Sequence, residues 1–172
     1  DNIWLGDRDG VRTPMQWTPD RNGGFSGGDP GRLYLPVIAD PVYGYQSLNV
    51  EAQIDSPGSL LRWTKRMIDV RRRHRAFGLG GFRELPSGNA AVMTYLREHC
   101  AEDGRLDIVL CVNNLSRHPQ AVELDLREFQ GHELTELTGG VEFPVIGAAP
   151  YQITLPGHGF YWFAIQMEVP SR

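Results

Sequence analysis

Apolar residues after Ser56 recur every three or four positions, which is the spacing of an amphipathic helix. The residues at this spacing are Leu60, Trp63, Met67 and Val70. Ser56 can cap such a helix and Pro57 suits its first position, so we predict a helix that begins at Pro57 and closes with the basic run 71–75. Its apolar stripe is wide, and we expect that face to pack against a large surface.

From Phe82 onward apolar and polar residues alternate with a period of two, and short turn sequences separate the alternating runs. The predicted strands are 81–85, 90–97, 107–113, 120–125, 133–137, 151–155 and 159–166. Many short strands joined by turns that contain Gly, Asn and Pro are typical of an antiparallel β-sandwich. The last strand is apolar on both faces, so we expect it in the middle of a sheet or against a neighbouring domain.

Residues 1–58 show neither periodicity, and glycine and proline recur throughout them. So long an irregular segment indicates either that the domain is incomplete or that the segment is a functional lid. Aromatic residues spaced along it predict a packed loop rather than a disordered one. Because the densest loop lies so close to Asp1, which no methionine precedes, we expect the chain to be part of a longer polypeptide.

Composition narrows the classes of function. The chain has 172 residues and a formal net charge of −4, which gives no support for binding to nucleic acid or to an anionic membrane. No apolar run approaches the roughly 20 residues that span a bilayer. Two cysteines do not form a disulfide framework. We predict a buried free thiol at Cys111, which lies in an apolar strand, and a reducing, cytoplasmic location.

The candidate site is the loop 6–17, which combines Asp, Arg, Gln and Trp side chains with Gly and Pro. Ordered loops of this kind carry binding residues on a rigid scaffold. Arg12 presents a planar fork of donors that suits a carboxylate or two neighbouring hydroxyls. Trp17 presents an apolar face with one donor, which suits a sugar ring. The alternative is a structural loop in which Arg12 pairs with an aspartate and Trp17 fills the core.

Other groups that could carry chemistry have structural explanations. Asp7 and Asp9 flank Arg8 and are expected to tie the loop down rather than to act as a catalytic pair. The basic run 71–75 is expected to face solvent and to complement the C-terminus of the helix, although such a run can also bind anions. The five histidines have no metal-ligand spacing, and we predict neither a metal ion nor a cofactor in this chain.

Several motifs resemble the α-amylase superfamily of glycoside hydrolases, in the branch that contains oligo-1,6-glucosidases, sucrose isomerases and trehalose synthases. These motifs are RTPMQW at 12–17, GFS at 24–26 and NVEAQ at 49–53. Further stretches resemble the trehalose synthase family in particular. They are DNIWLGDRD at 1–9, LYLP at 33–36 and DPVYGYQ at 40–46. The resemblance is specific over residues 1–77 and looser over the rest of the chain.

The resemblance implies that the chain is the C-terminal portion of such an enzyme, a mixed α+β fragment. Residues 1–76 are then the end of the catalytic (β/α)8 barrel, namely the loop after strand 8 followed by helix 8. Residues 77–172 are the C-terminal antiparallel β-sandwich domain.

The resemblance also implies a reaction, the interconversion of maltose and trehalose by intramolecular glucosyl transfer with retention. The family's catalytic carboxylates lie upstream of Asp1, so the chain alone is expected to be inactive. Arg12 carries over as a substrate-binding residue that pairs with an upstream aspartate and binds hydroxyls of the non-reducing glucose. Gln16, Trp17 and Tyr43 are candidates for supporting roles.

The implied partners are maltose, trehalose and glucose, the upstream barrel segment, a second copy of the protein in a homo-oligomer, and a maltokinase. Calcium is an implied ligand of the upstream part alone. Two alternatives stay open. One is a hydrolytic α-glucosidase of the same superfamily. The other is a non-catalytic sugar-binding module built on the sandwich, which predicts an exposed aromatic platform within residues 77–172.

Overall fold

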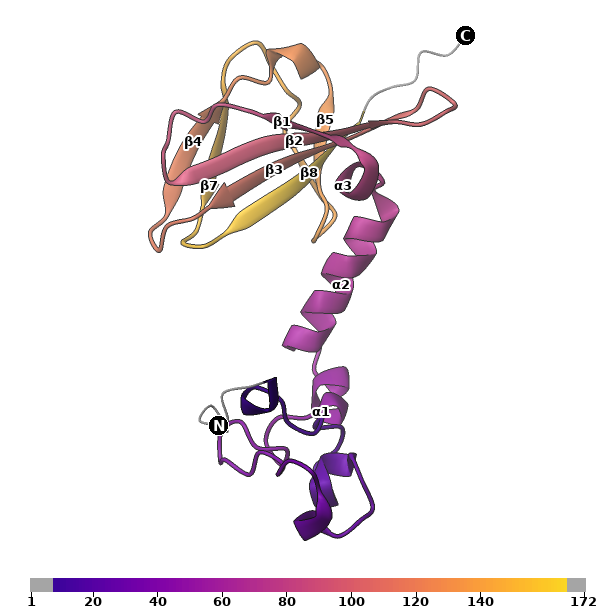
Figure 1. Cartoon of the computed structure of the whole chain (residues 1–172). Helices are drawn as coiled ribbons and strands as arrows, with labels where there is room; N and C mark the ends of the chain where they lie inside the picture. Colours follow the sequence, from indigo (N-terminus) through magenta and orange to yellow (C-terminus); the bar gives the residue numbers. More distant parts are fainter. Residues whose placement is uncertain (1–7, 167–172) are drawn as a thin grey trace. The chain divides into compact units, whose positions relative to one another are not determined.

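The computed structural model describes residues 8–166 of the chain (Figure 1). The chain divides into two compact units, Asp1–Lys65 and Arg66–Arg172. The described part of the first unit is mostly irregular, and that of the second is mostly β-structure. No helix among residues 8–166 is long and apolar enough to cross a membrane.

Turns and short helices make up the described part of the first unit. Its elements are η2 (Arg8–Gly10), η3 (Arg21–Gly24), η4 (Pro30–Arg32), α1 (Val50–Asp55) and the beginning of α2 (Leu60–Arg73). Hydrogen bonds from side chains to the backbone stabilise this irregular segment. Buried Asn22 donates from Nδ2 to the carbonyl oxygens of Ser26 and Gly28, both at 2.9 Å. These bonds show that the loop is ordered, but the predicted packing of its aromatic residues is wrong, because Trp17, Phe25, Tyr34 and Tyr43 are exposed.

The helix predicted to begin at Pro57 begins at Leu60 instead. Ser56 already ends α1, a six-residue helix too short to show a periodicity of its own. Ser59 takes the capping role, because its Oγ accepts a hydrogen bond from the Arg62 N–H at 3.2 Å. The predicted start was therefore wrong, and the serine nearer to the helix supplies the cap.

The basic run at the end of α2 divides between solvent and structure. Its arginine side chains, Arg71, Arg72, Arg73 and Arg75, are all exposed. His74 is half-buried and bonds to Asp107. The prediction that this run faces solvent is confirmed for the arginines, and the histidine has a structural partner.

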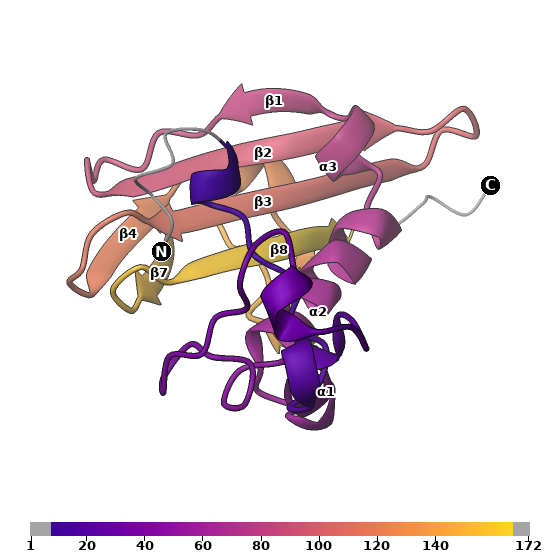
Figure 2. The same cartoon turned by 60° about the horizontal axis from the view of Figure 1, so that its bottom comes forward.

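Two antiparallel sheets form the second unit. The larger has the order β1-β2-β3-β8-β5-β6, and the smaller pairs β4 with β7. The strands are β1 (Gly81–Glu84), β2 (Val92–Cys100), β3 (Leu106–Asn114), β4 (Gln120–Leu124), β5 (Glu133–Glu136), β6 (Val141–Phe143), β7 (Tyr151–Leu155) and β8 (Phe160–Gln166). β8 lies between β3 and β5, which confirms its predicted central position, and Figure 2 shows it beside β3. The three-residue β6 was not predicted, because it is too short to show alternation.

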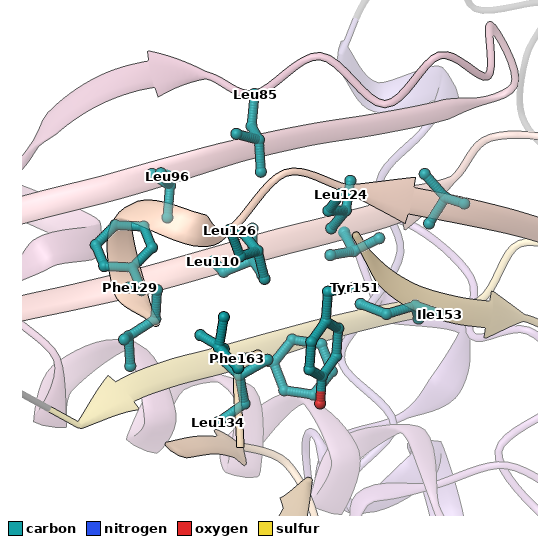
Figure 3. Packing of buried hydrophobic residues seen from close by; sticks show 14 of the residues in the cluster. Leu85, Leu96, Leu110, Leu124, Leu126, Phe129, Leu134, Tyr151, Ile153 and Phe163 are labelled. Carbon is teal, nitrogen blue, oxygen red and sulfur yellow. The ribbon is translucent and has the colours of Figure 1, made fainter. Parts of the chain in front are cut away.

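The two sheets pack face to face around a hydrophobic core (Figure 3). Leu96, Leu110 and Phe163 enter it from the larger sheet, and Leu124 and Ile153 enter it from the smaller one. Burying one such side chain contributes about 1.5–3 kcal/mol. The pairing of two sheets around one core confirms the predicted β-sandwich.

The short helix α3 (Ala76–Leu79) lies against β2 and β3 on the opposite face of the larger sheet (Figure 2). Arg97 of β2 holds this helix by donating to the carbonyl oxygens of Ala76 at 3.2 Å and Gly80 at 2.7 Å. The predicted free thiol at Cys111 is fully buried in the cluster beneath α3. Burial raises its pKa to about 11, so this thiol stays protonated at neutral pH.

Candidate functional site

Arg12 lies in the irregular segment that follows η2. Its side chain is exposed and makes no hydrogen bond or ion pair with any residue between 8 and 166. All five of its N–H donors are therefore available to a carboxylate or to hydroxyl groups of a ligand. The structural alternative required an aspartate partner for Arg12, and no aspartate in the described part of the chain fills that role.

Backbone hydrogen bonds fix Gln16 and Trp17 against α1. The Gln16 carbonyl oxygen accepts from the Val50 N–H at 2.9 Å, and the Trp17 carbonyl oxygen accepts from the Glu51 N–H at 3.0 Å. The first turn of a helix leaves its N–H groups without partners inside the helix, and here the loop supplies those partners. The loop that carries Arg12 and the start of α1 are thereby joined through backbone atoms.

The structure brings together two of the predicted supporting residues, Gln16 and Tyr43. Gln16 Nε2 donates to the Tyr43 carbonyl oxygen at 2.9 Å. Tyr43 belongs to a turn that Asp40 organises, because Asp40 Oδ1 accepts from the N–H groups of Val42 and Tyr43, both at 2.8 Å. Gly44 closes the turn by donating its N–H to the Asp40 carbonyl oxygen at 2.7 Å, and a Cβ at Gly44 would overlap that oxygen.

A pocket of about 720 Å³ lies beside this turn. Its lining includes Thr13, Gln16, Ile38, Asp40, Tyr43 and Leu48. The pocket therefore combines a carboxylate, an amide, two hydroxyl groups and apolar surface, the mixture found in sites for small polar molecules. Hydrogen bonds from the backbone N–H groups of Tyr43 and Val42 lower the pKa of Asp40, so its carboxylate is ionised at neutral pH.

The predicted site residues take different places around this pocket. Gln16 and Tyr43 line it, whereas Arg12 and Trp17 do not. Thr13, the neighbour of Arg12, does line it. Trp17 is 47% exposed, so it does not fill a core within residues 8–166.

Asp40 is a lining residue that the sequence analysis missed. The signal for it was present, because Asp-Pro followed by glycine at 40–44 is typical of a turn in which the aspartate side chain bonds to the backbone. Thr13 carried no comparable signal, since a threonine in an irregular segment has no pattern that marks it.

The acidic residues near the front of the loop have the structural role that was predicted, where the structure describes them. Asp9 Oδ2 accepts a hydrogen bond from the Tyr34 hydroxyl at 2.7 Å, which ties two parts of the loop together. Asp7 lies outside the described residues. Within residues 8–166 no three His, Cys, Asp or Glu side chains lie together as ligands for a metal ion.

Named proteins match nearly all of the chain in sequence. It is 64% identical to the trehalose synthase of Pimelobacter sp. (strain R48) and 62% identical to the trehalose synthase/amylase TreS of Mycobacterium tuberculosis (strain ATCC 25618 / H37Rv), each over 96% of this chain. It spans only 29% and 27% of the length of these two relatives. The solved structure of Bacillus licheniformis trehalose-6-phosphate hydrolase matches 94% of this chain, and 27% of its own, with a TM-score of 0.65 and 21% identity, which supports the fold alone.

Two family models match successive parts of the chain. The alpha amylase catalytic domain matches residues 3–80, and the maltogenic amylase C-terminal domain matches residues 82–162. The chain therefore belongs to the α-amylase superfamily of glycoside hydrolases, as a barrel end followed by a C-terminal β-domain. Within that superfamily it corresponds to the C-terminal part of the trehalose synthases.

Proposed function

We propose that the chain is the C-terminal part of an enzyme that interconverts maltose and trehalose. One observation carries this proposal, the identity of 64% and 62% to two trehalose synthases over 96% of the chain. The reaction breaks the glycosidic bond of maltose and forms a new one between two anomeric carbons. It is an isomerisation by intramolecular glucosyl transfer with retention.

Within that enzyme we assign residues 1–76 to the end of the catalytic barrel, as the loop after strand 8 and helix 8. Residues 77–172 are assigned to the C-terminal sandwich domain. The order of the two family matches supports this division. Exposed apolar side chains on α2 support it as well, with Leu60 71% and Ile68 44% exposed, because a barrel helix buries such a face against its neighbours.

Arg12 is the substrate-binding residue of this chain in the proposal. In a retaining transfer one carboxylate attacks the anomeric carbon while a carboxylic acid protonates the departing glucose oxygen. In the family these groups and a third carboxylate belong to the upstream barrel. A guanidinium with free donors can pair with a further carboxylate and bind sugar hydroxyls at the same time, which fixes the transferred glucose relative to the attacking group.

The second half of the reaction needs the departing glucose to stay bound. It must turn and attack the glucosyl-enzyme through its anomeric hydroxyl, which returns the proton and frees the carboxylate. Water that reaches the intermediate first releases glucose instead. The ratio of trehalose to glucose therefore reports how well the site retains its sugar.

The test uses the intact enzyme that contains this chain and, separately, the 172-residue polypeptide. With maltose as substrate, NMR of the anomeric protons is expected to show trehalose accumulating with the intact enzyme and no change with the polypeptide. Accumulation of glucose alone would contradict the proposed isomerisation. Trehalose formation by the polypeptide would contradict the placement of the catalytic carboxylates upstream.

A hydrolytic α-glucosidase or amylase activity is the second candidate, because the Mycobacterium tuberculosis relative is named a trehalose synthase/amylase. The same NMR experiment separates the two, since hydrolysis yields glucose without trehalose. A sugar-binding role of the sandwich is favoured by Phe82, which is 56% exposed and lies with its ring centroid 5.1 Å from that of Tyr95. Saccharide binding that Phe82→Ala abolishes would support that role.

The cellular setting of the enzyme is also proposed. The described cysteines are both free, with Cys100 exposed and Cys111 buried, which supports a reducing compartment such as the cytoplasm. A homo-oligomer and an associated maltokinase stay predictions from the resemblance. Size-exclusion chromatography with light scattering, and co-purification with a maltokinase, would test them.

A further inference from the structure

A second pocket lies within the second unit, between α2 and the turn that joins β5 to β6. Its volume is about 450 Å³. Most of its lining residues are charged, and the lining consists of Arg66, Asp69, Val70, Arg72, Arg73 and Thr138. Three guanidinium groups and one carboxylate leave this lining with a net positive charge, although the whole chain has a formal net charge of −4.

The carboxylate is placed among the three guanidinium groups along the helix. Arg66 precedes Asp69 by three residues, and Arg72 and Arg73 follow it by three and four. Residues at these spacings are neighbours on a helix surface, so exposed ion pairs within α2 are the structural alternative. Asp69 forms no such pair within residues 8–166. Even a complete ion pair would use only one of the three positive charges.

Arg72 and Arg73 have donors that the described chain does not use. Both side chains are exposed, and neither makes a hydrogen bond or an ion pair with a residue between 8 and 166. Each guanidinium carries five N–H donors in a planar fork. This fork matches two oxygens of a phosphate group, which makes arginine well suited to binding phosphate.

Both walls of the pocket are held in place by the β-domain. On the helix wall, His74 directly follows α2 and bonds to Asp107 of β3. On the opposite wall, Thr138 donates its N–H and its hydroxyl group to Oε1 of buried Glu136. The hydroxyl oxygen of Thr138 can still accept a hydrogen bond. Walls that are ordered in advance reduce the loss of conformational entropy when a ligand binds.

The pocket is expected to stay accessible when α2 is part of a barrel, as in the proposed function. Successive helix residues are turned by about 100°, so Ile68 and Arg66 lie on nearly opposite sides of α2. Ile68 is 44% exposed, and a barrel covers apolar side chains of this kind. The side of α2 with Arg66 and Arg73 therefore faces away from the surface that the barrel covers.

Charge and hydrogen bonding select the class of ligand. A phosphate monoester carries a charge of about −1.5 to −2 at neutral pH and three oxygens that accept hydrogen bonds. The free guanidinium groups of Arg72 and Arg73 match this charge, and the volume lies within the range of roughly 300–1,000 Å³ that is usual for small-molecule sites. We infer that this pocket binds a phosphate group, either free or on a small phosphate ester, through Arg72 and Arg73.

The test is isothermal titration calorimetry of the intact enzyme at neutral pH. Inorganic phosphate and glucose 6-phosphate are the two probes, and glucose is the uncharged comparison. Arg72→Gln and Arg73→Gln are each expected to weaken phosphate binding about fivefold. Asp69→Asn is expected to strengthen it about threefold, because it removes a negative charge that repels the ligand. A purely structural role of these exposed residues would not produce these opposite changes in affinity.

Arg75→Gln is the matched control, since Arg75 is an exposed arginine of the same basic run that does not line the pocket. It is expected to keep the affinity within about twofold. Equal affinities in the Arg72, Arg73 and Arg75 variants, or the absence of saturable phosphate binding, would overturn the site.

The two probes distinguish the source of the phosphate group. Tighter binding of glucose 6-phosphate that is weakened in the Arg72 and Arg73 variants assigns the site to phosphate esters, and equal binding of the two probes assigns it to free phosphate. The measurement involves neither maltose nor trehalose. Phosphate binding can therefore fail while the proposed isomerisation stands, and the isomerisation can fail while phosphate binding stands.

Discussion

The Nδ1 atom of His74 lies 2.9 Å from Oδ1 of Asp107, which joins the residue after α2 to strand β3. The other carboxylate oxygen of Asp107 accepts a hydrogen bond from the Ala76 N–H at 2.9 Å, at the start of α3. One carboxylate thus fixes both ends of the short connection between the two helices. Asp107 holds this connection on the β-domain together with Arg97, which donates to the Ala76 carbonyl oxygen at 3.2 Å.

Removing this carboxylate is expected to destabilise the β-domain. Asp107→Ala leaves the Ala76 N–H and the His74 ring without their partner, at a cost of about 1–3 kcal/mol. Hydrogen exchange of the amides in α3 and β3 measures the loss. Asp103→Ala is the control, because the Asp103–Arg105 pair at 2.7 Å is exposed and such pairs contribute about 0–1 kcal/mol. Equal losses in the two variants would contradict the role given to Asp107.

Glu136 is expected to need its negative charge. This buried side chain accepts from the Thr138 N–H at 2.9 Å through Oε1 and from the Gly139 N–H at 2.6 Å through Oε2. In Glu136→Gln one of these acceptors becomes an NH2 group that faces an N–H donor, so we expect a loss of about 1–3 kcal/mol in urea unfolding. Glu142→Gln, at an exposed position of β6, is expected to change stability by about 0.5 kcal/mol or less.

Stability is expected to fall in alkaline solution because of Cys111. Burial raises the pKa of this thiol from an ordinary 9.0 to about 11. Above pH 9 the unfolded chain therefore loses this proton while the folded chain keeps it. Ionisation lowers the free energy of the unfolded state, so the free energy of unfolding declines. The expected decline is about 1.4 kcal/mol per pH unit from this group between pH 9 and 11.

Variants at the two cysteines isolate that effect. Unfolding free energies at pH 9 and pH 10 are expected to differ less in Cys111→Ala than in the unmodified protein. Cys100 is exposed, so Cys100→Ala is expected to keep the original slope. Tyr95, whose pKa is raised to about 12 by burial and by its neighbour Cys111, adds its own decline above pH 10. A slope unchanged by Cys111→Ala would contradict the assignment.

Arg12 is expected to affect catalysis in the intact enzyme without affecting the stability of this chain. Because it makes no hydrogen bond or ion pair with residues 8–166, Arg12→Ala is expected to leave the melting temperature of the 172-residue polypeptide unchanged. In the proposed function the same change lowers kcat/KM for maltose at least about tenfold, or about 1.4 kcal/mol. Arg21→Ala, at an exposed position in η3, is the matched control for removing a surface arginine. Unchanged kcat/KM in Arg12→Ala would remove this residue from the site.

Features that depend on local periodicity could be predicted from the sequence. The alternation over β2, β4 and β7 predicted the sandwich, and the doubly apolar last strand predicted the central place of β8. The buried thiol at Cys111 followed from its place in such a run. The start of α2 could not be found in this way, because Ser56 and Ser59 both suit a cap and the choice depends on where α1 ends.

The candidate site could be predicted only in part. Arg12 and Gln16 stood out by residue type, but the bond from Gln16 to Tyr43 joins an amide to a backbone carbonyl 27 positions away. Every residue has such a carbonyl, so residue types alone do not identify the acceptor. The pocket depends on this fold-back of the chain, and so its lining could not be assembled from the sequence.

The N–H groups of Val50 and Glu51 donate to the carbonyl oxygens of Gln16 and Trp17. These two bonds close residues 18–49 into a loop that is fixed at both ends. A fastened loop can gain or lose residues with little effect on its base, since each doubling of loop length costs only about 0.6 kcal/mol. Insertions between Gly31 and Leu33, which lie after the bonds from Asn22 to Ser26 and Gly28 and before the bond from Tyr34 to Asp9, are therefore expected to be tolerated while Arg12 keeps its place. This part of the chain offers a site for attaching a tag or a reporter near the candidate site without disturbing Arg12.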